Sequence, residues 1–194
     1  MNVENLMQQA PIPPNEEERL AELYQLEILY TEPETAFDHI TSELAEIFQV
    51  PISTLSLIDR EHQFFKSGFG LPADLAQSRQ TSRAHSICGH VVGSNEMLIV
   101  NDVAADPRFA DNPLIRATGV RFYAGAPVRT RSGHAVGSLC IIDMKPRTIT
   151  PREARLLQLI ADTAMAEIKL RQVSRDLITL SGQLAERNKP NNLS

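Results

Sequence analysis

Apolar residues recur at helical spacing near the start of the chain. After Asn15 the repeated positions are Leu20, Leu23, Leu26 and Tyr30, a spacing typical of an amphipathic helix. A second helix is expected after Thr31, because Thr31 and Glu34 have the spacing of a capping box. Residues 1–15 hold three prolines and no such repeat, and they are predicted to form a flexible leader.

Denser apolar runs in the middle of the chain indicate β-strands. The expected strands span residues 52–59, 63–69, 97–102, 121–130 and 135–143, and the polar turn between the last two is typical of a hairpin. Residues 70–83 are expected to form a loop and residues 86–92 a short helix. This order predicts an α/β (α+β) fold: a central antiparallel sheet with the N- and C-terminal helices packed on one face and loops and short helices on the other.

The C-terminal segment predicts one long helix with two apolar stripes. Thr150, Pro151 and Glu153 supply an N-cap, a first-turn proline and the glutamate of a capping box. One stripe ends near Ile168 and is expected to cover the sheet. The other keeps the heptad spacing of a coiled coil, at Leu156, Leu159, Thr163, Ala166, Leu170, Val173, Leu177, Leu180 and Leu184. It is expected to meet a partner helix; the alternative is one broad face buried within a single domain.

These elements predict four parts of the chain and a homodimer. The parts are a flexible leader (1–15), a globular domain (16–170), a coiled-coil helix (171–187) and a disordered tail (188–194). The homodimer is expected to form through the first and last helices, with Leu20, Leu23, Leu170, Val173, Leu177, Leu180 and Leu184 at its interface. Residues 1–32 carry seven acidic and one basic residue, and residues 152–194 carry five acidic and seven basic ones. Opposite charge therefore favours packing of the end helices, weakly because salt screens it.

Composition narrows the class of protein. Hydrophobic residues make up 42% and charged residues 22% of the 194 residues, the balance of a folded globular protein. The net charge of −5 argues against nucleic acid as a partner. No apolar run approaches the ~18 residues of a membrane-spanning helix, and the N-terminus lacks the features of a secretory signal. With two cysteines and no disulfide framework, a cytoplasmic location without membrane contact is expected.

Five segments resemble the GAF domain family of small-molecule sensors. They are Ser53–Asp59, Ser86–His90, Val100–Phe109, Arg121–Val128 and Gly137–Asp143. Their order and spacing extend the resemblance over about residues 17–170. The resemblance implies a GAF/PAS-like fold and a non-catalytic sensory domain of bacterial signal transduction. It also implies that the terminal helices control an output domain of the histidine kinase or diguanylate cyclase type, with residues 171–187 as the signalling helix.

The resemblance further implies a ligand pocket against the sheet face that lies away from the end helices. Arg121 and Tyr123 share one face of their strand, and such a face suits a pocket with apolar walls and a few polar anchors. The expected ligand-binding residues are Arg83, Cys88, His90, Asp102, Arg121 and Tyr123. The small-molecule ligand and any cofactor are unknown. The alternative is a pocket filled by its own side chains, in a domain that serves only dimerisation.

The resemblance to the GAF family implies two alternative functions for Cys88. In bilin-binding GAF photoreceptors a cysteine in this region holds the chromophore, although the characteristic cysteine–histidine pair is not adjacent here. In GAF-type free methionine sulfoxide reductases a cysteine that resembles Cys88 acts with a resolving cysteine, and residues 70–83 contain no cysteine for that role. Otherwise Cys88, like Cys140, is expected to be a small buried hydrophobic residue. Two cysteines with scattered histidines do not make a metal site.

Overall fold

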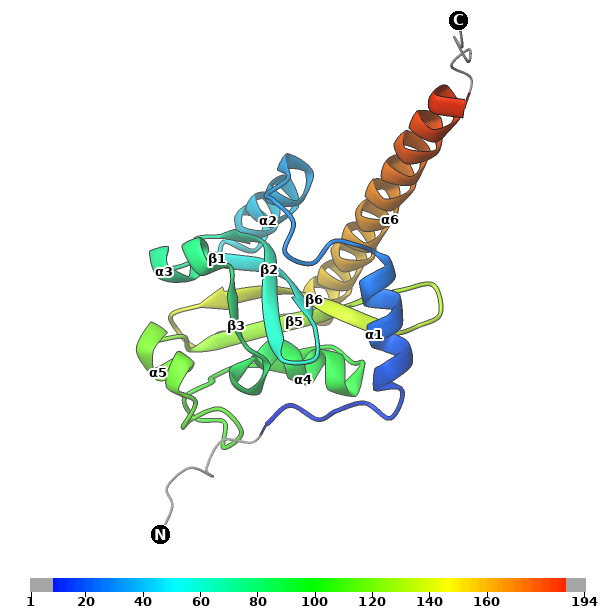
Figure 1. Cartoon of the computed structure of the whole chain (residues 1–194). Coiled ribbons are helices and arrows are strands. Elements are labelled where there is room, and N and C mark those ends of the chain that lie inside the picture. The colour runs from blue at the N-terminus through cyan, green and yellow to red at the C-terminus, as the bar shows by residue number, and fades with distance from the viewer. Residues whose placement is uncertain (1–8, 188–194) are drawn as a thin grey trace, which may run out of the picture.

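The structure is a computed structural model that describes residues 9–187 (Figure 1). Its strands are β1 Ile52–Ile58, β2 His62–Phe69, β3 Gln80–Ser82, β4 Leu98–Val100, β5 Phe122–Arg129 and β6 Ala135–Asp143. Its helices are α1 Glu16–Gln25, α2 Thr35–Phe48, α3 Ala73–Ser78, α4 Ile87–Ser94, α5 Pro113–Thr118 and α6 Pro151–Arg187, with a 3₁₀ turn, η1, at Arg83–His85. The strands pair antiparallel in one sheet of order β3-β2-β1-β6-β5-β4. Each strand expected from the sequence is present.

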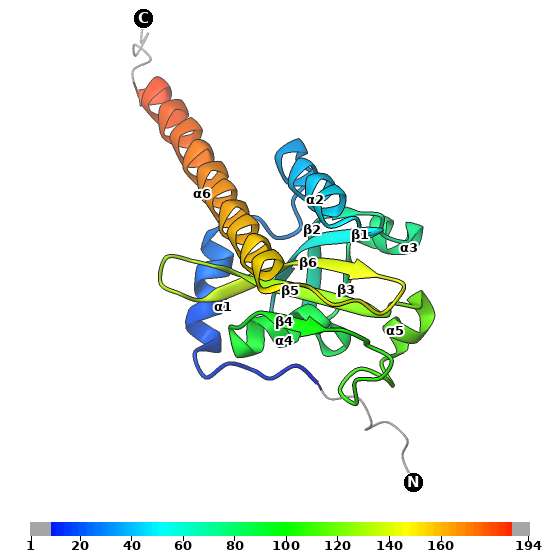
Figure 2. The ribbon, with the colours of Figure 1, turned by 180° about the vertical axis from the view of Figure 1, so that it is seen from behind.

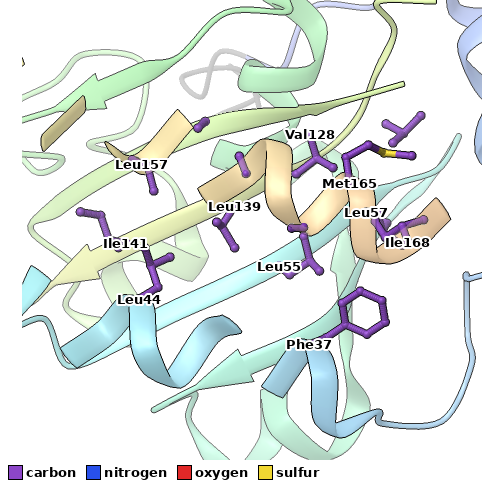
Figure 3. Packing of buried hydrophobic residues seen from close by; sticks show 14 of the residues in the cluster. Phe37, Leu44, Leu55, Leu57, Val128, Leu139, Ile141, Leu157, Met165 and Ile168 are labelled. Carbon is purple, nitrogen blue, oxygen red and sulfur yellow. The ribbon is translucent and has the colours of Figure 1, made fainter. Parts of the chain in front are cut away.

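Helices α1, α2 and α6 cover one face of this sheet, and α4 and α5 lie over the other (Figures 1 and 2). The first face carries the larger apolar core, which joins Phe37 of α2, Leu55 of β1 and Leu139 of β6 (Figure 3). The second face carries a smaller core that includes Val91 of α4 and Tyr123 of β5. The expected fold, with the end helices on one face and short helices on the other, is confirmed.

Alternate residues of β1 and β6 point into these two cores. Leu55 faces the larger core, whereas Thr54 and Ser56 face the other side and lie within hydrogen-bonding distance of each other, 3.1 Å between their hydroxyl oxygens. Directly opposite on β6, Cys140 pairs with Thr54 and Ser138 with Ser56. We call Thr54, Ser56, Ser138 and Cys140 the polar row; it lies beneath the smaller core, where strand residues are usually apolar.

Helix α6 seals the sheet and then leaves the globular body. Leu157, Met165 and Ile168 are buried against the larger core, so the first predicted stripe does cover the sheet. Beyond Ile168 no described side chain of α6 is buried, and the helix projects away from the body (Figure 1). From Leu159 onward the heptad stripe is exposed on the single chain. This exposure excludes the alternative of one broad face buried within a single domain.

One of the two predicted capping boxes is present. Thr150 N donates to Glu153 Oε2 at 2.7 Å, and Glu153 N donates to Thr150 Oγ1 at 3.2 Å. The box expected at Thr31 and Glu34 is wrong: Glu34 precedes the first residue of α2, and its carboxylate binds basic side chains from β2 and α6 instead. Residues 70–83 also differ from the expected loop, because they contain α3 and β3.

Two predicted dimer-interface residues are buried inside the chain itself. Leu20 and Leu23 of α1 are 1% and 0% exposed and belong to the larger core. The prediction that they contact a second protomer is therefore wrong, because the apolar face of α1 packs on its own sheet.

The leader is held against the domain where the structure describes it. A Cβ on Gly93 of α4 would collide with the carbonyl oxygen of Pro11, so the absence of a side chain lets the leader lie directly on α4. The flexibility of the leader stays a prediction. Residues 1–8 and the predicted disordered tail, 188–194, lie outside the described residues.

Candidate functional site

A cavity lies between the second sheet face and helices α3, α4 and α5. Its volume is about 80 Å³, which holds several water-sized molecules but is well below the ~300–1,000 Å³ of a drug-sized ligand site. Its walls are mostly apolar, with polar atoms from Gln63, Ser86, Cys88 and Tyr123 among the lining residues. The cavity therefore suits a molecule of a few atoms, held by a small number of polar groups.

Cys88 and Tyr123, two of the six predicted ligand-binding residues, line this cavity. The hydroxyl of Tyr123 donates to Cys88 Sγ at 3.3 Å and lies 3.3 Å from Ser138 Oγ. Gly125 makes this placement possible, because a Cβ there would collide with the tyrosine hydroxyl. The tyrosine thus brings its polar end over the polar row while its ring stays buried.

A second cysteine lies beside Cys88. Sγ of Cys140, on β6, is 3.9 Å from Sγ of Cys88, and both thiols are free and buried. Hydrogen bonding with Cys140 lowers the pKa of Cys88; the hydrogen bonds with Tyr123 and Ser56 act in the same direction, and burial opposes them. The same interaction with Cys88, together with burial, raises the pKa of Cys140. Cys140 was expected to be a core residue, and that expectation did not include its pairing with Cys88. The sequence does indicate which face it takes: Cys140 follows Leu139 in the strand, so its side chain points to the opposite face of the sheet.

Ser86 and Gln63 connect α4 to the polar row at the edge of the cavity. Ser86 Oγ accepts a hydrogen bond from Gly89 N at 2.9 Å, which caps α4, and the Ser86 hydroxyl donates to Gln63 Oε1. Gln63 Nε2 in turn donates to Ser56 Oγ at 3.0 Å. The position of α4 is therefore fixed by groups that also line the cavity. Neither Ser86 nor Gln63 belongs to the predicted set.

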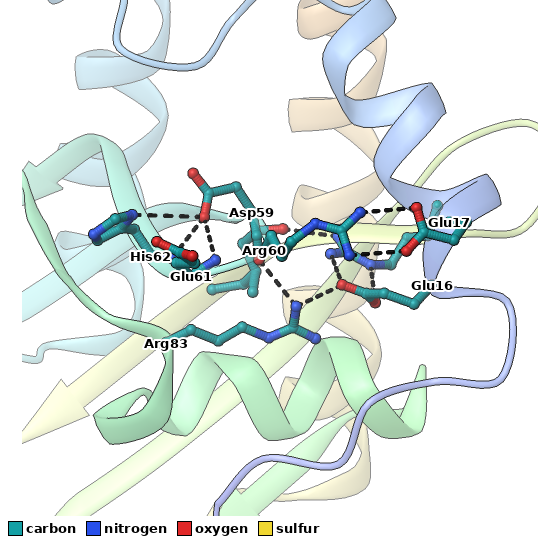
Figure 4. Close-up of polar contacts among 9 residues, drawn as sticks. Glu16, Glu17, Asp59, Arg60, Glu61, His62 and Arg83 are labelled. Atoms are coloured by element: carbon teal, nitrogen blue, oxygen red, sulfur yellow. Dashed lines mark hydrogen bonds and ion pairs between the residues drawn. The ribbon is translucent and has the colours of Figure 1, made fainter.

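Arg83 lies outside the cavity, in a buried ionic cluster beside α1 (Figure 4). Its Nη1 donates to Glu16 Oε1 at 2.5 Å and to the carbonyl oxygen of Asp59 at 3.0 Å. Arg19 bonds the same Glu16 carboxylate at 2.8 and 2.9 Å. Burial, the largest influence, raises the pKa of Glu16, but the bonds from the two arginines outweigh it and the net pKa is lowered. Arg83 therefore connects η1 to α1, and these bonds explain why a charged side chain is buried at this position.

Asp102, Arg121 and His90 also lie outside the cavity lining. Arg121 forms a bidentate pair with Asp102, at 2.8 and 2.6 Å, near the surface. The His90 ring packs edge-on against Phe109, with the ring centroids 4.9 Å apart. Arg121 precedes the first residue of β5, and its side chain pairs with Asp102 instead of lining the cavity.

The heptad stripe of α6 presents a second surface. Its members Leu170, Val173, Leu177, Leu180 and Leu184 are between 53% and 60% exposed. At the base of the projecting part, Arg171 Nε bonds Glu34 Oε1 at 2.7 Å and Arg175 Nη2 bonds Glu27 Oε2 at 2.6 Å. Of these pairs, Glu27 with Arg175 joins the acidic and the basic end of the chain. These bonds hold α6 against the segment between α1 and α2.

Residues 9–187 contain no group of three or more histidine, cysteine, aspartate and glutamate side chains placed to hold a metal ion. Within the same range, none of the helices has the length and apolar character of a membrane span.

Comparison with known proteins gives a bacterial relative. The chain is 36% identical over 160 residues to a cyclic di-GMP phosphodiesterase of Pseudomonas aeruginosa, an alignment that covers 81% of this chain and 26% of that protein. The chain thus spans about a quarter of the length of this relative.

Solved structures and a family model agree on the fold. The chain is similar to the GAF domain of a phosphoenolpyruvate-protein phosphotransferase from Coxiella burnetii, with a TM-score of 0.64, 17% identity and coverage of 82% of this chain and 95% of that one. It is also similar to a type II free methionine-R-sulfoxide reductase from Thermoplasma acidophilum, with a TM-score of 0.58, 16% identity and coverage of 69% and 90%. These likenesses show the fold alone. The GAF domain model matches residues 32–168, more than half of the sequence, and the chain therefore belongs to the GAF domain family.

Proposed function

We propose that this chain is a non-catalytic sensory domain of bacterial signal transduction, which takes up a small molecule in the cavity and controls an output domain through α6. The observation that carries the proposal is the shape of α6: it covers the sheet up to Ile168 and then projects from the body with an exposed heptad stripe. The name of the Pseudomonas aeruginosa relative supports an output that acts on cyclic di-GMP, as a cyclase or a phosphodiesterase. A histidine kinase output is the alternative.

The proposed homodimer forms through the heptad stripe of two α6 helices, without Leu20 or Leu23. Leucine and valine at alternating spacings of three and four residues are the side chains that pack knobs into holes in a coiled coil. Because these residues lie beyond the globular body, two helices can approach there without a clash between the domains.

A chain of contacts connects the cavity to the base of the projecting helix. Phe65 of β2 lines the cavity, and the next residue, Lys66, lies on the opposite sheet face over the ring of Phe37. Lys66 Nζ bonds Glu34 Oε1 at 2.6 Å, and the same carboxylate oxygen accepts a hydrogen bond from Arg171 of α6. A shift of β2 on ligand binding would therefore bias the packing of α6. The ligand must prefer one of the two packings, since equal affinity for both transmits nothing.

The dimer is tested by charging the stripe. The double variant Leu177→Glu with Leu180→Glu removes four leucines from the dimer, two from each chain. Each leucine is about half exposed in the single chain, so dimerisation can bury only that exposed half, and each contributes about 1 kcal/mol to the free energy of dimerisation. The dissociation constant should rise by about three orders of magnitude, measured by sedimentation velocity, with the domain still folded. The control, Ile178→Glu with Thr179→Glu, adds the same charge outside the stripe and should leave the dimer intact. An unchanged dimer in the first variant refutes the assignment of the stripe.

The ligand is tested by native mass spectrometry of the purified chain. A bound molecule should appear as a fixed mass increment that is lost on denaturation. Leu75→Trp, which fills the cavity from its partly exposed rim, should remove the increment while the circular dichroism spectrum stays the same. If the wild-type chain carries no increment and binds nothing from a small-molecule extract, the domain serves dimerisation alone.

The second candidate function is a thiol-dependent reductase. The observation that favours it is Cys140, whose sulfur lies 3.9 Å from that of Cys88 and supplies the second cysteine that residues 70–83 lack. The assay is turnover of free methionine sulfoxide with a thiol reductant. Turnover that disappears in Cys88→Ser would establish the reductase, and no turnover by the wild-type chain would eliminate it. The bilin alternative is tested by the visible absorption of the chain after addition of a bilin.

A further inference from the structure

The two cysteines stand out as a reactive pair that the proposed sensory function does not use. Both sulfurs are buried, they come from different elements, α4 and β6, and they lie 3.9 Å apart. We infer that Cys88 and Cys140 are an oxidation site for hydrogen peroxide or a small organic hydroperoxide, which enters the cavity and converts the two thiols to an intrachain disulfide.

The geometry already brings the two sulfurs close to bonding distance. A disulfide has an S–S length of about 2.05 Å, so the sulfurs must approach each other by roughly 2 Å from their present contact. No side chain intervenes along this path, since the two sulfurs are in direct contact. Disulfide formation therefore requires the two cysteine side chains to rotate toward each other.

The surroundings assign different roles to the two thiols. Cys88 receives hydrogen bonds from the Tyr123 hydroxyl at 3.3 Å and from Gln63 Nε2 at 3.7 Å, which favour its thiolate. Cys140 has Thr54 Oγ1 at 3.0 Å and keeps its proton longer, because the neighbouring Cys88 and burial raise its pKa. The thiolate is the nucleophile in cysteine chemistry, so Cys88 reacts first and Cys140 second.

Access to the pair is also asymmetric. Cys88 lines the cavity, and Cys140 is not among its lining residues and is fully buried. A volume of about 80 Å³ holds several molecules of the size of water, and hydrogen peroxide has only two heavy atoms. A small peroxide therefore reaches Cys88 through the cavity, whereas a bulky oxidant is excluded from both sulfurs.

The reaction proceeds in two balanced steps. The Cys88 thiolate attacks one peroxide oxygen, the O–O bond breaks, and the leaving oxygen takes up a proton as water or as an alcohol; Cys88 is now a sulfenic acid. The Cys140 sulfur then attacks the Cys88 sulfur, the S–O bond breaks, and the hydroxyl leaves with the Cys140 proton as a second water. In sum, one peroxide is reduced by two electrons and two thiols are oxidised to one disulfide.

The disulfide would change the cavity as well as the sulfurs. Its formation draws Cys88 Sγ away from the cavity wall toward β6 and ties the first turn of α4 to the sheet. Because α4 also carries Ser86 and its link to Gln63, the redox state of the pair sets how firmly this wall is held. Disulfide formation needs neither a dimer nor an output domain, so its failure and a failure of the sensory proposal are distinguishable.

The test uses the whole reduced chain and hydrogen peroxide. Intact mass should fall by two hydrogen atoms per chain, alkylation after unfolding should find no free thiol, and a thiol reductant should reverse both changes. A peptide map should show Cys88 joined to Cys140 of the same chain. In Cys140→Ser the sulfenic acid should persist on Cys88 and be trapped by dimedone once the chain is unfolded, and in Cys88→Ser the remaining thiol should resist peroxide. Tyr123→Phe, which keeps the ring, should slow the reaction several-fold at neutral pH.

Three results would overturn the inference. They are two unmodified thiols in the folded wild-type chain after exposure to excess peroxide, a disulfide between chains rather than within one, and irreversible oxidation of Cys88 without involvement of Cys140. The peptide map of the wild-type chain decides among these outcomes even where a serine variant fails to fold.

Discussion

The buried ion pair between Lys66 and Glu34 gives the sharpest stability prediction. The Lys66 side chain is completely buried, and its Nζ donates to Glu34 Oε1 at 2.6 Å, to the Glu32 carbonyl at 2.7 Å and to Thr31 Oγ1 at 2.9 Å. Burial, the largest influence, lowers the pKa of Lys66, while the Glu34 carboxylate opposes that shift. In Glu34→Ala the ammonium group would keep two neutral acceptors but lose its only bonded carboxylate among the described residues.

The magnitude follows from the burial of the two partners. Removing one member of a fully buried ion pair costs about 3–5 kcal/mol. The Glu34 side chain is 36% exposed, so water can reach the place of its carboxylate and the expected loss is about 2 kcal/mol. For a domain of this size that corresponds to a fall in the melting temperature of about 4–8 °C.

Lys66→Met supplies the matched control. It removes the buried charge and leaves Glu34 bonded to Arg171, so its stability should stay within about 1 kcal/mol of the wild type. Adding Glu34→Ala to Lys66→Met should cost little more, because no uncompensated ammonium remains. Urea unfolding of the four proteins measures the coupling free energy. Additive losses, or a Lys66→Met variant as unstable as Glu34→Ala, would refute the reasoning.

Two further predictions concern a glycine and a carboxylate. Gly125→Ala should destabilise the domain by about 1–3 kcal/mol, because its Cβ would collide with the Tyr123 hydroxyl; thermal melting checks this, and an unchanged midpoint would contradict it. Since the pKa of Glu16 is lowered from its ordinary value of 4.5 in the folded chain, its contribution to stability is present above that value and lost as the pH falls through the folded pKa. Glu16→Gln should therefore flatten the stability-versus-pH curve below 4.5; a curve parallel to that of the wild type would argue against it.

Much of the fold follows from local patterns in the sequence. The core-facing stripe that ends at Ile168 and the capping box at Thr150 each depend on neighbours along the chain, so spacing alone predicted them. The capping box predicted at Thr31 and Glu34 is absent because the Glu34 carboxylate binds Lys66 and Arg171 instead. These two cations come from distant elements, and the local spacing of residues does not predict their approach.

The candidate site was less predictable, because it is assembled across strands. Tyr123 and Cys88 were found through a family resemblance, whereas Arg83 was misplaced because its pairing partner, Glu16, lies far away in the sequence. Cys140 was missed for a related reason: its role depends on the register of β6 against β1, which sets it beside Thr54. Register is a tertiary property that alternation alone does not specify.

The described start of the leader and the projecting helix α6 lie on opposite sides of the sheet. Residues 9 to 11 run along α4, on the cavity side of the sheet, and α6 departs from the other side (Figures 1 and 2). A bulky residue at Gly93 would therefore displace residues 9–11 from the cavity side of the sheet without touching α6, which packs on the other face.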